Sequence, residues 1–275
     1  MSKPVSQHAI QYDRAETVQP RHLSKASKPE LARVQVQTMV ERLPFTISIA
    51  QTPAELERVV AIRHGAYARH VPDFAETLQE AESIDFDYGV AILLASSKVD
   101  GSPLGTMRIQ TNRFTPLEVE SSLALPPWLA TRRLAEAARL GVTHEKVGRL
   151  VKSMLFKAYF QYCQLNKVDW MVITARSPVD RQYDRLMFDD VYSEMGYVPL
   201  HHVHNIPHRV MKFEIETAQE RWAEASHPMY DFVFNTIHPD IDLRMNDVST
   251  GCGSPPSFQT NKVALPRAAT HFAHA

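Results

Sequence analysis

Apolar residues between positions 44 and 244 follow two different periods, and this predicts a mixed order of strands and helices. Residues 45–51 alternate as a strand does, whereas the apolar side chains of 53–71 recur at helical spacing. The segments 91–97 and 104–112 flank an Asp-Gly turn signal and predict an antiparallel hairpin. The patterned region therefore opens with a strand, a helix and a hairpin.

A strand, a loop, a helix and a second strand are predicted next. Residues 133–142 predict a strand, and 148–167 predict a helix with one apolar stripe that excludes Lys152 and Lys157. Residues 168–175 form an apolar run typical of a buried strand. The remaining expected elements are a helix near 180–188, a strand at 209–216, and helical stretches around Arg221 and 230–237. Antiparallel strands followed by a parallel crossover indicate an α/β fold with a mixed sheet.

The two ends of the chain differ from this region in composition. Residues 1–43 are mostly polar and predict an extension, in which Leu31, Val34 and Val40 fit a short amphipathic helix. Residues 245–275 are rich in Ser, Pro, Gly, Thr and Ala, which predicts a mobile tail. One folded domain is thus expected over 44–244.

Composition narrows the class of protein. The 275 residues carry 30 basic and 31 acidic side chains, a formal net charge of -1, which does not favour nucleic acid as a ligand. The two cysteines, Cys163 and Cys252, lie far apart and do not indicate a disulfide framework or a zinc site. Neither a signal peptide nor a stretch of the ~20 apolar residues of a membrane helix is found in the sequence. We expect a cytoplasmic protein without an integral membrane segment.

Charged and aromatic residues recur at four places in the patterned region. They are Arg63 and Tyr67 in the first helix, Glu82, Asp85 and Asp87 in the loop after it, Arg108 on a hairpin strand, and Glu136 and Arg139 on the next strand. In this order they resemble the GNAT superfamily, and more closely its branch of N-acylhomoserine lactone synthases and bacterial N-acyl amino acid synthases. The resemblance covers roughly 46–243, and segments 191–200 and 230–242 add to it. It implies a GNAT-like acyl-CoA N-acyltransferase fold, a central mixed sheet flanked by helices.

The resemblance also implies roles for these residues. Glu136 would point into the cleft and remove the proton of an ammonium group, with Glu82 as a second candidate base. Backbone N–H groups near 138–140 would face a thioester carbonyl if that strand bulges. The residues that would order an acceptor pocket are Arg63, Tyr67, Asp85, Asp87, Arg108 and Arg139. Interior salt bridges would explain the same charges equally well, and an arginine left free would bind an amino acid carboxylate.

A donor site is expected at the start of the helix that begins near Gly148. A helix N-terminus offers unpaired N–H groups to a phosphate, but Glu145 and Leu150 depart from the usual coenzyme A pattern. A carrier protein's arm bears one phosphate, and the basic residues here suit an acidic partner. The residues assigned to the phosphate or carrier are Thr143, Lys146, Gly148, Arg149 and Lys152. The alternative is an ordinary solvated helix.

Four histidines near the end of the domain superficially resemble metal ligands. On a strand, His202 and His204 would share a face, while His201 and His208 lie nearby. Without a clear third ligand, such a pair is more often a surface or hydrogen-bonding pair, and no metal site is predicted.

The leading functional hypothesis is an N-acyltransferase that moves a long-chain fatty acyl group from acyl carrier protein to an amino acid. No bound cofactor is expected, and acyl-acyl carrier protein or acyl-CoA would be the co-substrate. The alternatives are an N-acylhomoserine lactone synthase, an acetyl-CoA-dependent N-acetyltransferase and a non-catalytic acyl- or carrier-binding module. The single residue between Asp85 and Asp87 argues against the lactone synthase, which usually has two.

Overall fold

The computed structural model describes residues 38–245. Leu31 and Val34 of the expected amphipathic helix and residues 246–275 of the expected tail lie outside the described residues. Val40 lies in strand β1 (Met39–Val40), which pairs with β10 (Thr236–Ile237), so a helix is the wrong prediction for that residue. Residues 39–43, expected in the extension, contact the C-terminal segment, because Leu43 N–H donates to Asp240 Oδ2 at 2.8 Å.

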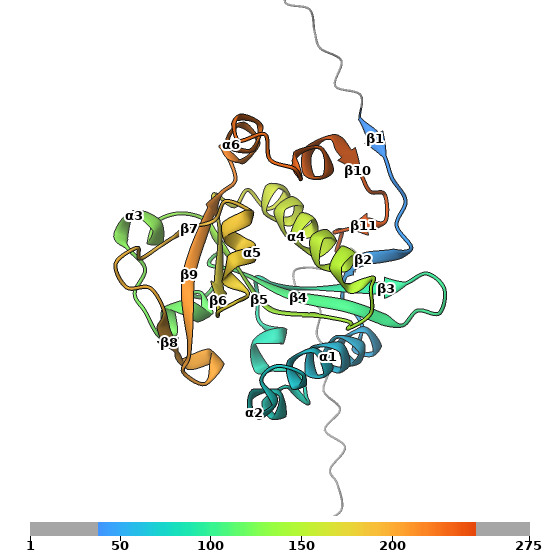
Figure 1. Ribbon diagram of the computed structural model, residues 1–275. Coiled ribbons are helices and arrows are strands. Elements are labelled where there is room, and N and C mark those ends of the chain that lie inside the picture. The colour runs from blue at the N-terminus through green and yellow to red at the C-terminus, as the bar shows by residue number, and fades with distance from the viewer. Residues whose placement is uncertain (1–37, 246–275) are drawn as a thin grey trace, which may run out of the picture. The chain divides into compact units, whose positions relative to one another are not determined.

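A mixed sheet forms the centre of the fold (Figure 1). Its strands are, in spatial order, β11 (Ile241–Asp242), β2 (Phe45–Ile49), β3 (Val90–Ser97), β4 (Pro103–Thr111), β5 (Leu134–Val142), β6 (Trp170–Ala175), β9 (Ile206–Glu214) and β7 (Asp189–Asp190), and β8 (Val198–Leu200) also pairs with β9. The β5–β6 and β11–β2 pairs are parallel and the others antiparallel. The predicted mixed sheet, hairpin and parallel crossover are confirmed.

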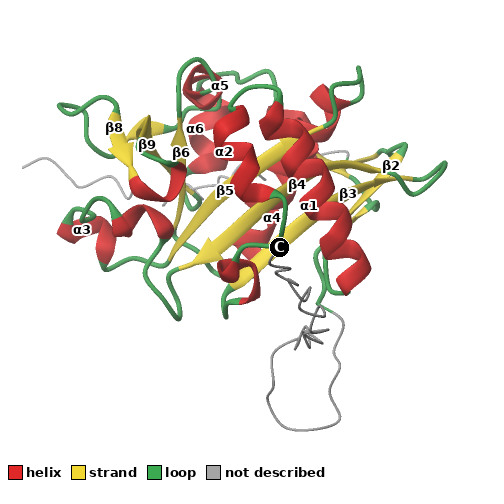
Figure 2. Cartoon of the chain, turned by 90° about the horizontal axis from the view of Figure 1, so that it is seen from below, coloured by secondary structure: helices red, strands yellow, loops and turns green. Residues whose placement is uncertain are grey.

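Helices cover both faces of the sheet. They are α1 (Pro53–Ala68), α2 (Pro72–Ala75), α3 (Pro127–Ala130), α4 (Gly148–Leu165), α5 (Asp180–Arg185) and α6 (Ala218–Glu224). Figure 1 shows α4 on one face and α1 on the other, and Figure 2 shows α1 and α2 in front of the strands from the second face. Two glycines permit this close packing, since a Cβ on Gly105 would meet Val151 of α4 and one on Gly141 would meet Ala66 of α1.

Helix α1 begins where its sequence provides a capping box. Thr52 Oγ1 accepts from the N–H of Glu55, and the Glu55 carboxylate accepts from the N–H of Thr52 at 3.0 Å. Pro53 occupies the first turn, where its missing N–H removes no helical hydrogen bond. The start of this helix is therefore encoded locally.

Helix α4 is covered on more than its predicted stripe. Lys157, expected outside the apolar stripe, is fully buried, and its Nζ donates to the carbonyl oxygens of Phe232 and Thr236 at 2.6 and 2.5 Å. The prediction is wrong because the C-terminal segment packs over this side of α4 (Figure 1). That segment comprises α6, a π-helical turn over Asp231–Asn235, β10 and β11. Helical structure near Arg221 and 230–237 is thus confirmed except at the last two residues, which form β10.

Candidate functional site

A pocket lies where β5 and β6 separate. Their parallel pairing ends at Ala137 and Ile173, and a cavity of about 280 Å³ follows. Residues 137–142 of β5 line one side, and residues 174–176 with side chains of α5 line the other. Residues of α1, α2, α4, η4 (His201–Val203) and β9 also contribute to the lining. Segments distant in sequence therefore meet at this point.

Strand β5 bulges beside the pocket. Thr106 pairs with Gly141 and Arg108 with Ala138, so Arg139 and Leu140 together face one residue of β4. Arg139, the first bulged residue, has a φ of 55°, in the left-handed region that non-glycine residues seldom adopt. The condition set for the N–H groups near 138–140, a bulge in this strand, is therefore met.

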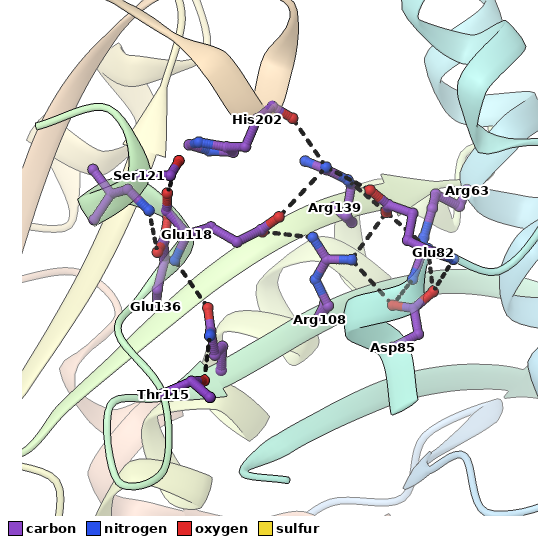
Figure 3. Close-up of polar contacts among 12 residues, drawn as sticks. Arg63, Glu82, Asp85, Arg108, Thr115, Glu118, Ser121, Glu136, Arg139 and His202 are labelled. Atoms are coloured by element: carbon purple, nitrogen blue, oxygen red, sulfur yellow. Dashed lines mark hydrogen bonds and ion pairs between the residues drawn. The ribbon is translucent and has the colours of Figure 1, made fainter. Parts of the chain in front are cut away.

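Six buried or half-buried charges form an ion cluster beside the bulge (Figure 3). Its members are Arg63 of α1, Glu82 and Asp85 around η2 (Ser83–Phe86), Arg108 of β4, Glu118 of η3 (Glu118–Ser121) and Arg139 of β5. Arg63 binds Asp85 through both terminal nitrogens at 2.7 and 3.1 Å. Arg108 bridges Asp85 at 3.1 Å and Glu118 at 2.5 Å. The cluster joins a helix, two strands and two loops.

Glu82 lies at the centre of this cluster. It accepts from Arg139 at 2.7 and 2.8 Å, from Arg108 at 2.9 Å and from Arg63 at 3.1 Å. Burial alone would raise the pKa of Glu82. The hydrogen bonds and positive charge of these arginines outweigh burial and lower this pKa to about 2. A carboxylate held in this way is a weak proton acceptor.

The structure separates the other residues expected in the acceptor pocket. Tyr67 and Arg139 line the pocket, whereas Asp87 is exposed and lies apart from the ion cluster. Because Arg63, Arg108 and Arg139 all pair with protein carboxylates, none of them is an arginine left free for an amino acid carboxylate. The geometry of these three arginines fits the interior salt-bridge alternative.

Glu136 is buried behind the pocket rather than on its surface. Only 1% of the residue is exposed, and it is absent from the residues that line the pocket. Its Oε2 accepts from the N–H of Val119 at 3.1 Å, and Oε1 has no partner among the described residues. Burial, followed by the nearby charge of Glu118, raises the pKa of Glu136 to about 8. The expectation that this carboxyl points into the cleft is wrong, because η3 covers it (Figure 3).

The start of α4 has the glycine that its turn requires. A Cβ on Gly148 would collide with the Thr143 carbonyl oxygen, and the N–H of Gly148 donates to Glu145 O at 2.9 Å. Lys146 and Arg149 are exposed at this end of the helix. Lys152, one turn further, reaches the pocket and donates to Gln182 Oε1 at 2.5 Å. The predicted donor residues are thus divided between the surface and the pocket.

Two histidines missed as functional candidates lie near the bulge. His202 and His204 do not share a strand face, because His202 lies in the turn η4 and His204 in a left-handed conformation after it. His202 is partly buried, and burial lowers its pKa to about 4. His208 lies on β9 and is among the residues that line the pocket. No group of His, Cys, Asp and Glu within residues 38–245 is arranged to hold a metal ion, and no helix there is long and apolar enough to cross a membrane.

Comparison with known proteins identifies the fold. No family model and no curated protein matches the sequence. The structure superposes on FeeM, an N-acyl amino acid synthase from uncultured soil microbes, with a TM-score of 0.51 and 16% identity over 66% of this chain and 96% of that one. The chain has the GNAT fold.

Other proteins of the GNAT fold align less well. BjaI, described as a CoA-dependent acyl-homoserine lactone synthase, gives a TM-score of 0.48 and 17% identity over 73% of this chain and 93% of its own. A Desulfovibrio desulfuricans protein described as a GNAT-family acetyltransferase gives 0.44 and 14% identity over 62% of this chain and 99% of its own.

Proposed function

We propose that the protein is an N-acyltransferase that moves a long-chain acyl group from acyl carrier protein to the amino group of an amino acid. The pocket at the divergence of β5 and β6 carries this proposal, because it combines an apolar end with cationic side chains in a GNAT fold. The N-acyl amino acid synthase activity named for FeeM supports the same class of reaction.

The apolar end of the pocket suits the acyl group. Tyr67, Val71, Phe74, Val203 and Ile206 line it. Apolar surface removed from water contributes roughly 25 cal/mol per Å², so an acyl chain would gain from entering this end. The bulge at 138–140 would then place backbone N–H groups near the thioester carbonyl, where negative charge develops during attack by an amine.

The cationic side chains suit an anionic group of a substrate. Arg69, Lys152 and Arg176 line the pocket, and none of them forms an ion pair with a described residue. Arg176 bonds only weakly to the Ser177 carbonyl, at 3.4 Å. A guanidinium group free of protein carboxylates can bind an acceptor carboxylate through two hydrogen bonds. This arrangement supports an amino acid rather than a simple amine as acceptor.

The carrier protein would dock at the exposed start of α4. Lys146 and Arg149 point to solvent there and lack acidic partners among residues 38–245. Acyl carrier proteins present an acidic face, and opposite charges at an interface raise the association rate more than they change the chemistry. Lys152 would lie beside the donor's arm where the arm passes from this surface into the pocket.

Mass spectrometry of reaction mixtures tests this function. The full-length chain is incubated with palmitoyl-acyl carrier protein or palmitoyl-CoA and a mixture of the twenty amino acids. We expect N-palmitoyl amino acids, formed faster from the carrier-bound donor. Lys146→Glu with Arg149→Glu should raise KM for the carrier-bound donor at least about tenfold and leave kcat nearly unchanged.

Lys167→Glu, at the opposite, exposed end of α4, is the matched charge-reversal control and should change neither constant. Product from neither donor would contradict the proposed function. If product forms and the KM for the carrier-bound donor is equal in the parent and the double variant, the start of α4 does not bind the carrier protein.

A further inference from the structure

His208 occupies the pocket at the point where β6 leaves β9. The last pair between these strands joins Ala175 to Arg209, and His208 is the next residue along β9. Its side chain lines the same pocket as the bulge of β5 and Arg176, although only 8% of the residue is exposed. His208 therefore borders the space in which acceptor and donor would meet, and its imidazole is close enough to Arg176 and Arg139 to feel their charges.

The hydrogen bonding of His208 determines its tautomer. Nδ1 lies 2.7 Å from the carbonyl oxygen of Ile206. A carbonyl oxygen only accepts, so Nδ1 carries the proton of the neutral ring and Nε2 carries the lone pair. No hydrogen bond to Nε2 is made by the described residues. The ring thus presents a fixed, unprotonated nitrogen.

The surroundings keep this ring neutral. Burial lowers the pKa of His208, the Ile206 carbonyl opposes this effect, and the positive charges of Arg176 and Arg139 lower the pKa further. His202, on η4, also interacts with it. Because the ordinary pKa of histidine is near 6.5, the lone pair on Nε2 is available at neutral pH.

The carboxyl and phenol groups near the bulge are less suited to accept a proton. Glu136 lies outside the pocket, and its raised pKa of about 8 keeps it protonated at neutral pH. Glu82 is bonded by three arginines. Burial raises the pKa of Tyr67 and of Tyr183, so both pocket tyrosines are protonated as well.

We propose that His208 is the general base of the acyl transfer, an inference that rests on the proposed function. Nε2 takes one proton from the acceptor's ammonium group, and the freed amine attacks the thioester carbonyl carbon. A C–N bond forms, the C–S bond breaks, and the leaving thiolate takes the second proton of the amine. His208 then releases its proton to water, which restores the neutral ring and balances the reaction.

A His208→Asn variant tests this role with little change to the fold. The Asn side-chain amide can still donate to Ile206 O, but it has no basic nitrogen. With palmitoyl-acyl carrier protein and the amino acid mixture, we expect kcat to fall about 10²–10³-fold at pH 7.5 with donor KM nearly unchanged. The acidic limb of the parent's kcat–pH profile, which reports protonation of the base, should disappear.

His201→Asn is the matched control, because His201 is an exposed residue of the nearby turn η4 and lies outside the pocket. This variant should retain the parent's kcat and its kcat–pH profile. An active parent with an equally active His208→Asn variant would overturn the role of His208 alone. Loss of the acidic limb in Glu136→Gln but not in His208→Asn would place the base at Glu136. An inactive parent would overturn the proposed function and this role with it.

A measurement without substrate tests the structural premise. Imidazole ¹H–¹⁵N correlation spectra of the full chain, assigned with the His208→Asn variant, report which ring nitrogen carries the proton. We expect a proton on Nδ1 at pH 7.5, and its titration below the range of an exposed histidine. A proton on Nε2 at that pH would overturn the proposal.

Discussion

Individual side chains near the bulge are held in opposite protonation states by their neighbours. Glu82 and Glu136 are both carboxyl groups on the same side of the sheet, but arginines surround the first, whereas burial, followed by the charge of Glu118, dominates at the second. The pKa of Glu82 is therefore about 2 and that of Glu136 about 8. Contacts, not residue type, decide which carboxyl is charged.

Glu136 should make the folded state less stable as pH rises. Its pKa is raised from 4.5 to about 8, so the folded state binds more protons than the unfolded state between these values. Stability contributed by this group is present below pH 4.5 and is lost as pH rises through 8, a change on the order of 5 kcal/mol. Glu136→Gln should remove this decline.

Urea unfolding of the parent and Glu136→Gln at pH 5 and pH 9 measures the effect. The variant should gain stability relative to the parent at pH 9 and gain little at pH 5. Equal differences at the two pH values would show that Glu136 has an ordinary pKa.

The contact of α4 with the sheet depends on a residue without a side chain. A Cβ on Gly105 of β4 would lie 2.6 Å from Val151 Cγ1 and 3.1 Å from Leu155 Cδ1. Both neighbours are fully buried, so they have little room to move. Helix and strand therefore fix each other's position beside the pocket.

Gly105→Ala should destabilise the fold by about 1–3 kcal/mol, because the added methyl group overpacks this contact. Gly65→Ala is the control, since Gly65 lies within α1 and a Cβ there meets nothing within 4 Å. It should stabilise the protein by about 0.5–1 kcal/mol through helix propensity. Thermal and urea unfolding measure the stability of both variants. A Gly105→Ala variant as stable as the parent would show that α4 is loosely packed.

Helices and strands that are encoded by short stretches of sequence could be predicted, whereas the segments that pack against them could not. The capping box at Thr52, the Asp-Gly turn and the apolar stripe of α4 are contained within short windows, and the corresponding helices and strands are found. Lys157 looked solvent-exposed because its cover, including His238, comes 81 residues later. For the same reason Glu136 seemed open to the cleft, since periodicity does not show that η3 folds over it.

The pocket illustrates the same limit of local patterns. The motif around Glu136 and Arg139 located the correct strand and its bulge. His208 and Arg176 carry no motif, and only the pairing of β6 with β9 brings them beside that bulge. In the sequence, the only sign of this residue is a histidine directly before the strand expected at 209–216.

At the scale of the whole described chain, the C-terminal segment closes the structure. β10 pairs with β1, β11 pairs with β2 and forms the edge of the sheet, and Asp240 binds Lys98 at 2.7 Å. Aromatic contacts add to this closure, with Phe160 of α4 against Phe234 at 5.5 Å between ring centroids. Lys157 Nζ lies 2.9 Å from His238 Nδ1 within the same contact.

Lys157→Met should loosen this segment before the rest of the fold. The variant leaves the carbonyl oxygens of Phe232 and Thr236 without their donor, at a cost of about 1–3 kcal/mol for each buried group left unpaired. Hydrogen exchange followed by mass spectrometry should show faster exchange over 229–243 and little change in β3–β5. Lys167→Met, at the exposed end of α4, is the control, and uniform acceleration across the chain would contradict a local role.

The pairing of β10 and β11 with the first strands also sets when folding can finish during synthesis. The ribosome releases β2 early, but its outer neighbour β11 is the last described element to emerge. Until residue 242 has left the exit tunnel, the edge of β2 and the buried face of Lys157 have no cover. The nascent chain must therefore carry an unfinished sheet through most of its translation, and the native state is reached only once the whole domain is free.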